Sequence, residues 1–220
     1  MTLRLQKIVQ AIPSVQTLCD VGCDHGYIGL GAWQQGKAQN VIFMDISAPS
    51  LAKAQSNCTN AQMHNCQFIC QDGIQDALCD CAVIAGMGGL ETISILQHTK
   101  HLPQHLVLQP MRNQVDVRKY LLANNYKITL DVKFFDGKYY DLLVAEKTEK
   151  AMQLTHLQLK FGLSNLANPS QDFVTFLLAE KQKYTQILTQ CKDEEVVEKL
   201  SNICLALEQI GGPQWFKNKC

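Results

Sequence analysis

Short apolar runs that alternate with helical stretches constrain most strongly what this chain can fold into. The runs are TLCDVG, NVIFMDI, CQFICQDG, CAVIAGMG and HLVLQPM, all within residues 17–111. Between and after them lie YIGLGAWQQG, APSLAKAQSNCTNA, LETISILQHTK and VDVRKYLLANN, which have helical patterns. Strands and helices at this spacing predict βαβ units, and therefore an open, doubly wound parallel sheet of α/β class with helices on both faces.

The pattern changes after Asn125, where strand-like runs follow one another directly. Residues 126–147 hold two β-rich runs joined around Asp136-Gly137, a dipeptide that favours the tight turn of a hairpin. We therefore expect seven strands, of which the last two form an antiparallel hairpin. This ending is typical of a Rossmann-like methyltransferase sheet rather than of a nicotinamide dehydrogenase.

Residues beyond 150 show helical spacing without strand signals. Apolar residues recur at helical intervals in residues 173–190 and 193–210, and Gly211-Gly212-Pro213 ends the second segment. Two amphipathic helices with a short connection predict an antiparallel, coiled-coil-like hairpin. We expect a sheet domain over 1–150 and a C-terminal helical domain over 151–220. The hairpin either packs on the sheet or grips a substrate, and both roles stay open.

Composition excludes several classes of protein. The chain of 220 residues carries 20 basic and 20 acidic side chains, so we expect no highly charged nucleic-acid coat. It has no membrane span, and its amphipathic start lacks the apolar core of a signal peptide, which predicts a cytoplasmic protein. Ten cysteines are then expected as reduced thiols. No pair of zinc knuckles is present among them, so we expect no metal site.

The end of the first apolar run indicates which cofactor binds. Ligands of open parallel sheets bind at the carboxyl ends of the strands, and this run ends in DVGCDHG, residues 20–26. A G-x-G-x-x-G fingerprint counted from Gly22 would need a glycine where Asp24 stands. Carboxylates at Asp20 and Asp24 repel a pyrophosphate but suit the ammonium and sulfonium groups of S-adenosylmethionine. The turn therefore favours the sulfonium cofactor.

Two further strand ends fit a nucleoside. Asp45 ends the second run and can bind both ribose hydroxyls through its two oxygens. Asp72 ends the third run and can accept a hydrogen bond from the adenine amino group, while Gly73 leaves room for the ring. The ribose contact is common to both cofactors, so it supports a nucleotide without choosing between them.

The fourth strand end, AGMGG at residues 85–89, indicates the methyl acceptor. Enzymes that methylate an exocyclic amino group often carry Asn, Asp or Ser followed by two prolines at this point. The glycines here leave open space and backbone groups near the methyl donor. A ring nitrogen such as adenine N1 has a free lone pair and needs placement more than deprotonation. The motif suits such a nucleophile, although tight helix–strand packing would also explain the glycines.

Together these motifs resemble the bacterial tRNA (adenine-22-N1)-methyltransferases. The resemblance rests on DVGCDHGY, DIS, QDG, IAGMGG, LVLQP and YYDLLVAE in this order, followed by a helical hairpin. It implies a Rossmann-like catalytic domain, S-adenosylmethionine as methyl donor, S-adenosylhomocysteine as product, and tRNA as partner. The implied cofactor contacts are Asp20, Gly22, Cys23, Asp24, His25, Asp45, Ile46, Asp72, Gly73, Gly86 and Met87. The implied substrate contacts are Tyr27, Gly88, Gly89, Gln109, Pro110 and Arg112.

Three residues of the first turn are candidates for catalysis. Methylation of N1 makes the adenine a cation, so we expect Asp24 to stabilise the developing charge. His25 either relays a proton or forms a hydrogen bond at a helix start. Tyr27 either stacks on a base turned out of the RNA or packs against its neighbours. No covalent enzyme intermediate is expected.

Basic residues between positions 112 and 140 predict the RNA surface. They outnumber the acids of this segment by three, and we expect Arg118 and Lys119 to contact phosphates and so supply the energy that turns out the base.

Other functions stay open: a methyltransferase for another RNA or a small molecule, a cofactor-binding RNA module without turnover, or, with the weakest support, a nicotinamide dehydrogenase. We further expect a monomer that binds no membrane.

Overall fold

The computed structural model describes residues 1–191 and 193–211, which divide into two compact units. The first unit consists of residues 1–130 and 140–152, and the second of 131–139 together with the chain from Gln153 onward. Residues 131–139, which the sequence assigns to the sheet domain, therefore group with the C-terminal helices.

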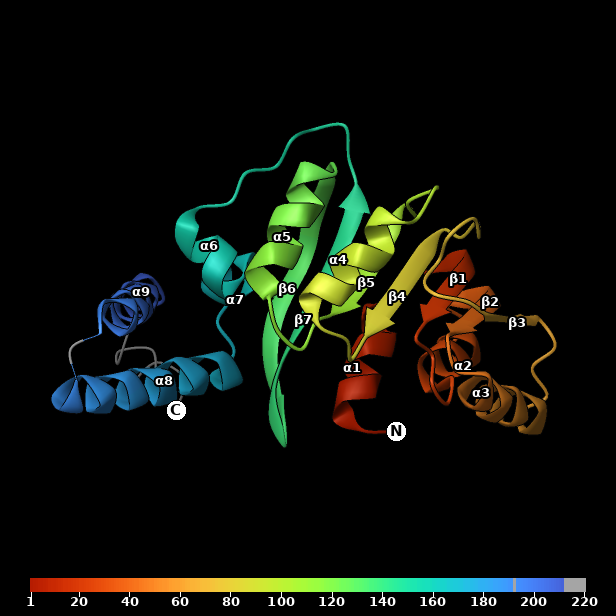
Figure 1. Ribbon diagram of the computed structural model, residues 1–220, viewed down its shortest axis with the longest axis horizontal. Coiled ribbons are helices and arrows are strands. Elements are labelled where there is room, and N and C mark those ends of the chain that lie inside the picture. Colours follow the sequence, from red (N-terminus) through yellow and green to blue (C-terminus); the bar gives the residue numbers. More distant parts are fainter. Residues whose placement is uncertain (192, 212–220) are drawn as a thin grey trace. The chain divides into compact units, whose positions relative to one another are not determined.

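A seven-stranded sheet organises the first unit (Figure 1). Its strand order is β3-β2-β1-β4-β5-β7-β6; β1 to β5 pair in parallel, and β7 runs antiparallel to β5. The predicted sheet is confirmed, as is the turn at Gly137 between its last two strands. The strands are β1 (Val15–Val21), β2 (Ala38–Asp45), β3 (Cys66–Cys70), β4 (Cys81–Ala85), β5 (His105–Gln109), β6 (Tyr126–Asp136) and β7 (Lys138–Lys147).

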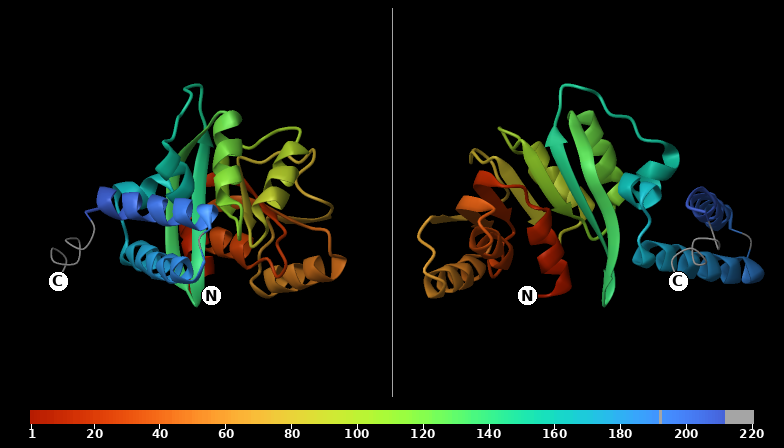
Figure 2. Two further views of the ribbon diagram at one scale, coloured as in Figure 1. Left: turned by 60° about the vertical axis from the view of Figure 1, so that its left-hand side comes forward. Right: turned by 180° about the vertical axis from the view of Figure 1, so that it is seen from behind.

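Helices cover both faces of the parallel strands. Right-handed crossovers place α2 and α3 on one face, because they lead from β1 to β3, and α4 and α5 on the other. The first helix, α1, packs beside α2, and the right-hand view of Figure 2 shows this red and orange layer. The helices of this unit are α1 (Leu3–Ala11), α2 (Tyr27–Gln34), α3 (Ala48–Asn60), α4 (Gly89–Gln97) and α5 (Gln114–Ala123).

The strand order reverses between β1 and β4, and this reversal fixes where a ligand can bind. Leu18 to Val21 of β1 are all buried because β2 and β4 flank the strand and helices cover it. The connections from β1 and β4 leave in opposite directions, which opens a crevice at their carboxyl ends. The turns at residues 22–26 and 86–89 lie at this carboxyl edge.

The second unit is helical apart from the tip of the β6–β7 hairpin. Its two long helices, α8 and α9, share an apolar core built from Phe173, Leu177, Ile203 and Leu207, which confirms the predicted helical hairpin. Two short helices before them, α6 and α7, were not predicted. Gly212 and Pro213, expected to end the second helix, lie outside the described residues. These helices are α6 (His156–Phe161), α7 (Leu163–Ala167), α8 (Gln171–Gln190) and α9 (Glu194–Gln209).

Within residues 1–191 and 193–211, no helix combines the length and apolar character needed to cross a membrane.

Candidate functional site

Backbone hydrogen bonds hold the turn after β1 on the end of β2. Gly22 and Cys23 donate their N–H groups to the carbonyl oxygen of Met44, at 2.8 and 3.0 Å. The N–H of Asp24 donates to Asp45 Oδ2 at 3.0 Å. Gly22 adopts φ +66°, a left-handed conformation that favours glycine, and Asp24 adopts φ +46°. The turn is therefore fixed by backbone contacts and presents its main chain at the carboxyl edge.

Asp20 and Asp24, paired in the sequence analysis, have different surroundings. Asp20 is 2% exposed, and its Oδ2 accepts a hydrogen bond from the Gly29 N–H in the first turn of α2, at 2.8 Å. Burial is the main cause that raises the pKa of Asp20 to about 7; the Gly29 hydrogen bond opposes this rise, and the nearby charge of Asp45 adds to it. Asp24 is exposed. Asp20 thus shapes the turn from inside, whereas the carboxylate of Asp24 lies at the surface.

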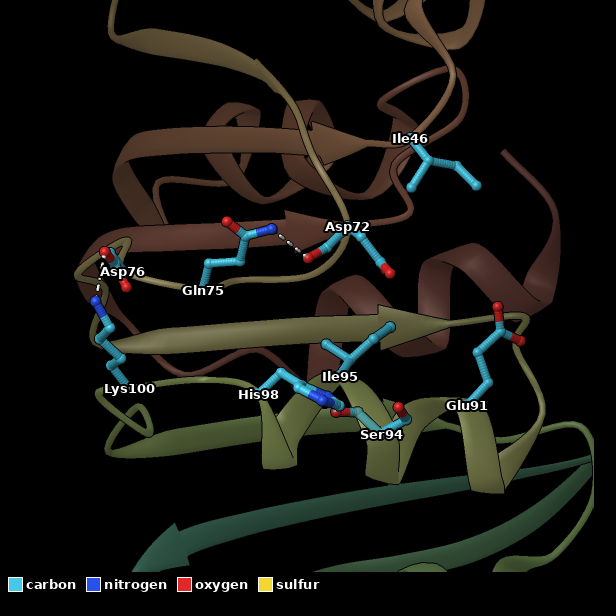
Figure 3. A pocket seen from close by; sticks show the side chains of 9 residues that line it. All are labelled: Ile46, Asp72, Gln75, Asp76, Glu91, Ser94, Ile95, His98 and Lys100. Atoms are coloured by element: carbon cyan, nitrogen blue, oxygen red, sulfur yellow. Dashed lines mark hydrogen bonds and ion pairs between the residues drawn. The ribbon is translucent and has the colours of Figure 1, made fainter.

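Ile46, the residue after Asp45, lines a cavity of about 670 Å³ (Figure 3). The Oδ1 of Asp45 accepts a hydrogen bond from the Ser47 N–H at 2.9 Å, so the Asp45 carboxylate is fixed at the end of β2. Figure 3 shows Ile46 and Glu91 at one end of the cavity, Asp72 between the ends, and the Asp76–Lys100 ion pair at the other. Two of the predicted nucleoside contacts, Ile46 and Asp72, therefore line one cavity.

The loop after β4 needs its glycines. Gly86 has φ +87°, and its N–H donates to the carbonyl oxygen of Gln109 at 3.1 Å. A Cβ on Gly89 would lie 2.5 Å from the carbonyl oxygen of Arg112, which accepts the Gly89 N–H at 3.0 Å. Met87 places its Cε against Gly22, where a Cβ would collide with it. This contact brings together the ends of β1 and β4, as the predicted cofactor contacts require.

The three predicted catalytic side chains gather at the start of α2. The rings of His25 and Tyr27 stack with centroids 5.4 Å apart and an angle of 4° between their planes. His25 Nε2 lies 3.6 Å from Asp24 Oδ2. Tyr27 is 48% exposed, and Asn57 donates a hydrogen bond to the carbonyl oxygen of His25 at 2.9 Å. Two aromatic rings and one carboxylate thus lie side by side at the turn after β1 and the start of α2.

Arg4 reaches the carboxyl edge from α1, which the sequence analysis did not assign to the site. Its Nε donates to Gln109 Oε1 at 2.6 Å, and its guanidinium carbon lies 5.3 Å from the ring centroid of Tyr140. A terminal guanidinium nitrogen lies 2.9 Å from where a Cβ of Gly86 would be. Gln109, a predicted substrate contact, is 1% exposed and binds Arg4. The only sequence signal was an unbalanced positive charge in an amphipathic helix.

The prediction that Arg118 contacts RNA from the surface is wrong. Arg118 is 1% exposed on the inner face of α5, beside the buried Val117, and it pairs with Asp141 on β7 at 3.7 Å. Lys119, the next residue, is exposed, as is Arg112. Helical geometry turns neighbouring residues by about 100°, so one of two consecutive cations can be buried while the other is exposed.

Comparison with known proteins identifies the family. A model described as a methyltransferase domain matches residues 1–143. A tRNA (adenine(22)-N(1))-methyltransferase of Bacillus subtilis is 30% identical over 198 residues, which cover 84% of this chain and 80% of that protein. The chain belongs to the tRNA (adenine(22)-N(1))-methyltransferase family. The resemblance inferred from the motifs is therefore confirmed.

Solved structures share the fold of this tRNA methyltransferase family member. TrmK of M. capricolum, solved with S-adenosylhomocysteine, is 20% identical, with a TM-score of 0.86 and coverage of 96% of this chain and 99% of that chain. The TrmK crystal structure from Bacillus subtilis gives 24% identity, a TM-score of 0.76, and coverage of 96% and 97%. All predicted site residues lie within the range that the methyltransferase model matches.

Proposed function

We propose that this protein transfers a methyl group from S-adenosylmethionine to N1 of adenine 22 in tRNA. The observation that carries the proposal is the meeting of two loops at the carboxyl edge. The acidic turn at residues 22–26 touches the proline-free loop at 86–89 through Met87 and Gly22. The first loop suits a cationic methyl donor, and the second leaves room for a ring-nitrogen acceptor. The methyltransferase domain matched over residues 1–143 supports methyl transfer, and the 30% identity to the Bacillus subtilis tRNA (adenine(22)-N(1))-methyltransferase supports this acceptor.

The residues at this edge fit the methyl donor. Gly22 brings bare backbone to the crevice, Asp45 holds a fixed carboxylate for ribose hydroxyls, and Ile46 and Asp72 line a cavity beside it. Cys23, Gly73, Gly86 and the main chain of His25 complete the proposed contacts. When bound, S-adenosylmethionine supplies a sulfonium methyl group that the N1 lone pair can accept, while the sulfur keeps the electrons of the broken bond.

The exposed side chains at residues 24–27 are suited to bind the target adenine. The adenine gains positive charge as N1 is methylated, and Asp24 offers an exposed carboxylate to stabilise it. Tyr27 presents a half-exposed ring, held in a stack with His25, on which a base can lie. His25 lies 3.6 Å from the Asp24 carboxylate and can hold it in position. Gly88, Gly89 and Pro110 border the acceptor side.

The tRNA itself requires positive charge around this edge. Arg112 and Lys119 are exposed and are proposed to bind phosphates, whereas Arg118 is excluded by burial. We assign catalysis to residues 1–150 and a supporting helical domain to 151–220. The protein is proposed to act as a cytoplasmic monomer, and sedimentation with and without tRNA tests the oligomeric state.

Methyl transfer from labelled S-adenosylmethionine tests the function. Wild-type protein should label tRNA transcribed without modifications and should leave free adenosine unlabelled. Asp24→Ala should transfer methyl groups at least tenfold more slowly than wild type, even at saturating S-adenosylmethionine. Labelling of adenosine alone would favour a small-molecule methyltransferase. Cofactor and tRNA binding without any labelling would favour a non-catalytic module, and both results would contradict the proposal.

A further inference from the structure

Leu90 and Met111 are exposed apolar side chains that border the loop after β4. Leu90 is 60% exposed, and Met111 is 37% exposed. Met111 also pairs with the loop through its backbone, because its N–H donates to the carbonyl oxygen of Met87 at 2.8 Å. The glycines at 86, 88 and 89 add no side chains of their own. Apolar surface therefore borders the loop that is proposed to receive the acceptor nucleotide.

A buried amide holds the sulfur of Met111. Nε2 of Gln109 donates to Met111 Sδ at 3.3 Å. Gln109 is 1% exposed, so almost none of its own surface is available to a substrate. The Nε–H group of Arg4 can only donate, and it donates to Gln109 Oε1 at 2.6 Å. The oxygen of the amide is thereby directed to Arg4, and its NH₂ group is directed to the thioether.

This contact prepares Met111 for binding a ring. An unbranched methionine side chain samples many rotamers, and ordering it on binding costs free energy. The contact with Gln109 lowers that cost because the rotamer is selected before the ligand arrives. A thioether is also polarisable and packs favourably against aromatic rings. Adenine is an aromatic ring whose N1 needs placement for the attack on the methyl group.

We propose that Met111 packs against the ring of the target adenine, and that Gln109 is a positioning residue that holds Met111 for this contact. The inference rests on the proposed function, because it takes adenine 22 of tRNA as the acceptor. A purine has two faces, so the contact is compatible with the base lying on Tyr27. The thioether is neutral and does not repel a ring that gains positive charge during methylation.

A double-mutant cycle between the side chain and the base tests the contact. The four complexes combine wild-type protein or Met111→Ala with unmodified tRNA or with tRNA that lacks the base at position 22. Dissociation constants are measured at saturating S-adenosylhomocysteine, and kcat/KM is measured for unmodified tRNA. Leu78→Ala is the matched control, because Leu78 is a 68% exposed apolar side chain that precedes the amino end of β4.

Met111→Ala should weaken the binding of unmodified tRNA about threefold to tenfold and lower kcat/KM to a similar extent. Binding of the tRNA without the base should be the same for both proteins, because the partner of the side chain is missing. Equal weakening for both tRNAs, no weakening for either, or an equal effect of Leu78→Ala would overturn the inference.

Met111→Leu tests the contact with Gln109. Leucine keeps the apolar character but has no sulfur to accept the hydrogen bond from Nε2, so this variant should fall between wild type and Met111→Ala in the same cycle. Wild-type behaviour of Met111→Leu would overturn the positioning role of Gln109. Because Met111 is partly exposed, both variants should fold, and thermal unfolding and S-adenosylhomocysteine affinity should match those of wild type.

The wild-type protein separates this inference from the proposed function. Methylation of adenine 22 without coupling between Met111 and the base would overturn the role of Met111 alone. Coupling between Met111 and the base without any methylation would overturn the proposed function and leave the contact standing.

Discussion

Adding one methyl group at Gly22 tests how the ends of β1 and β4 meet. An alanine there must adopt φ +66°, which costs about 1–2 kcal/mol for an L-residue. Its Cβ would also displace the end of Met87, at about 0.5–1.5 kcal/mol if that flexible side chain leaves its preferred rotamer. Alanine also lowers the conformational entropy of the unfolded chain relative to glycine, which stabilises the folded state by about 0.4–1 kcal/mol. Gly22→Ala should therefore lower the free energy of unfolding by about 0.5–3 kcal/mol.

Gly36 provides a matched control for this substitution. It has φ +69°, and an added Cβ would meet no atom within 4 Å. Gly36→Ala therefore bears the same backbone cost without displacing a side chain. Gly36 precedes the amino end of β2, whereas the proposed cofactor contacts lie at the carboxyl ends of the strands. The difference between the two variants isolates the contact with Met87.

Thermal unfolding and calorimetric titration with S-adenosylhomocysteine measure the two effects. Overpacking at Gly22 should weaken cofactor binding by about 1–3 kcal/mol, or roughly 5- to 150-fold. Gly36→Ala should bind the cofactor as wild type does. If Gly22→Ala binds S-adenosylhomocysteine with wild-type affinity, the backbone of this turn does not approach the ligand, and the placement of the cofactor at this edge is refuted.

The remaining predictions concern two buried charges and one exposed charge. Burial raises the pKa of Asp20 to about 7, so its contribution to stability is complete below about pH 4. That contribution falls by on the order of 4 kcal/mol as the pH rises from about 4 to about 7, and roughly 3 kcal/mol of this fall lies between pH 5 and pH 8. Asp20→Asn should remove most of this fall in urea unfolding at pH 5 and pH 8, and a variant that retains it would contradict the burial argument. Arg118→Met removes the ion pair between Arg118 and the buried Asp141 and should lower the free energy of unfolding by about 3–5 kcal/mol. The slope of log tRNA affinity against log salt concentration should not change in this variant. Lys119→Ala should reduce that slope by roughly 0.7–0.9 at unchanged stability; a reversed pattern would show that Arg118 contacts RNA after all.

Local sequence patterns were enough to predict much of the fold. The alternation of apolar runs and helical stretches predicted β1 to β5 with α2 to α5, and Asp136-Gly137 predicted the hairpin, because turn chemistry and periodicity act over a few residues. Helices α6 and α7 have only six and five residues, too few to show a helical period. The grouping of residues 131–139 with the second unit depends on tertiary packing, which no local pattern encodes.

Part of the candidate site could also be predicted from the sequence, because strand ends can be recognised locally. Strand ends converge at one edge of a parallel sheet, so Gly22, Asp45 and Met87 could be assigned to it from order alone. The burial of Arg118 could not be predicted, because its partner Asp141 is distant in sequence and because burial depends on which side of α5 packs against the sheet. Arg4 was missed because its contact with Gln109 exists only once α1 has packed beside β5.

Mapping the methylated nucleotide tests the central claim most directly. Unmodified tRNA is incubated with the purified protein and S-adenosylmethionine and is then analysed by primer extension. A methyl group on N1 of adenine blocks base pairing and therefore stops the reverse transcriptase. The account predicts one new stop at adenine 22 and none when guanine replaces that adenine. No new stop, or a stop at another position that persists after the replacement, would contradict it.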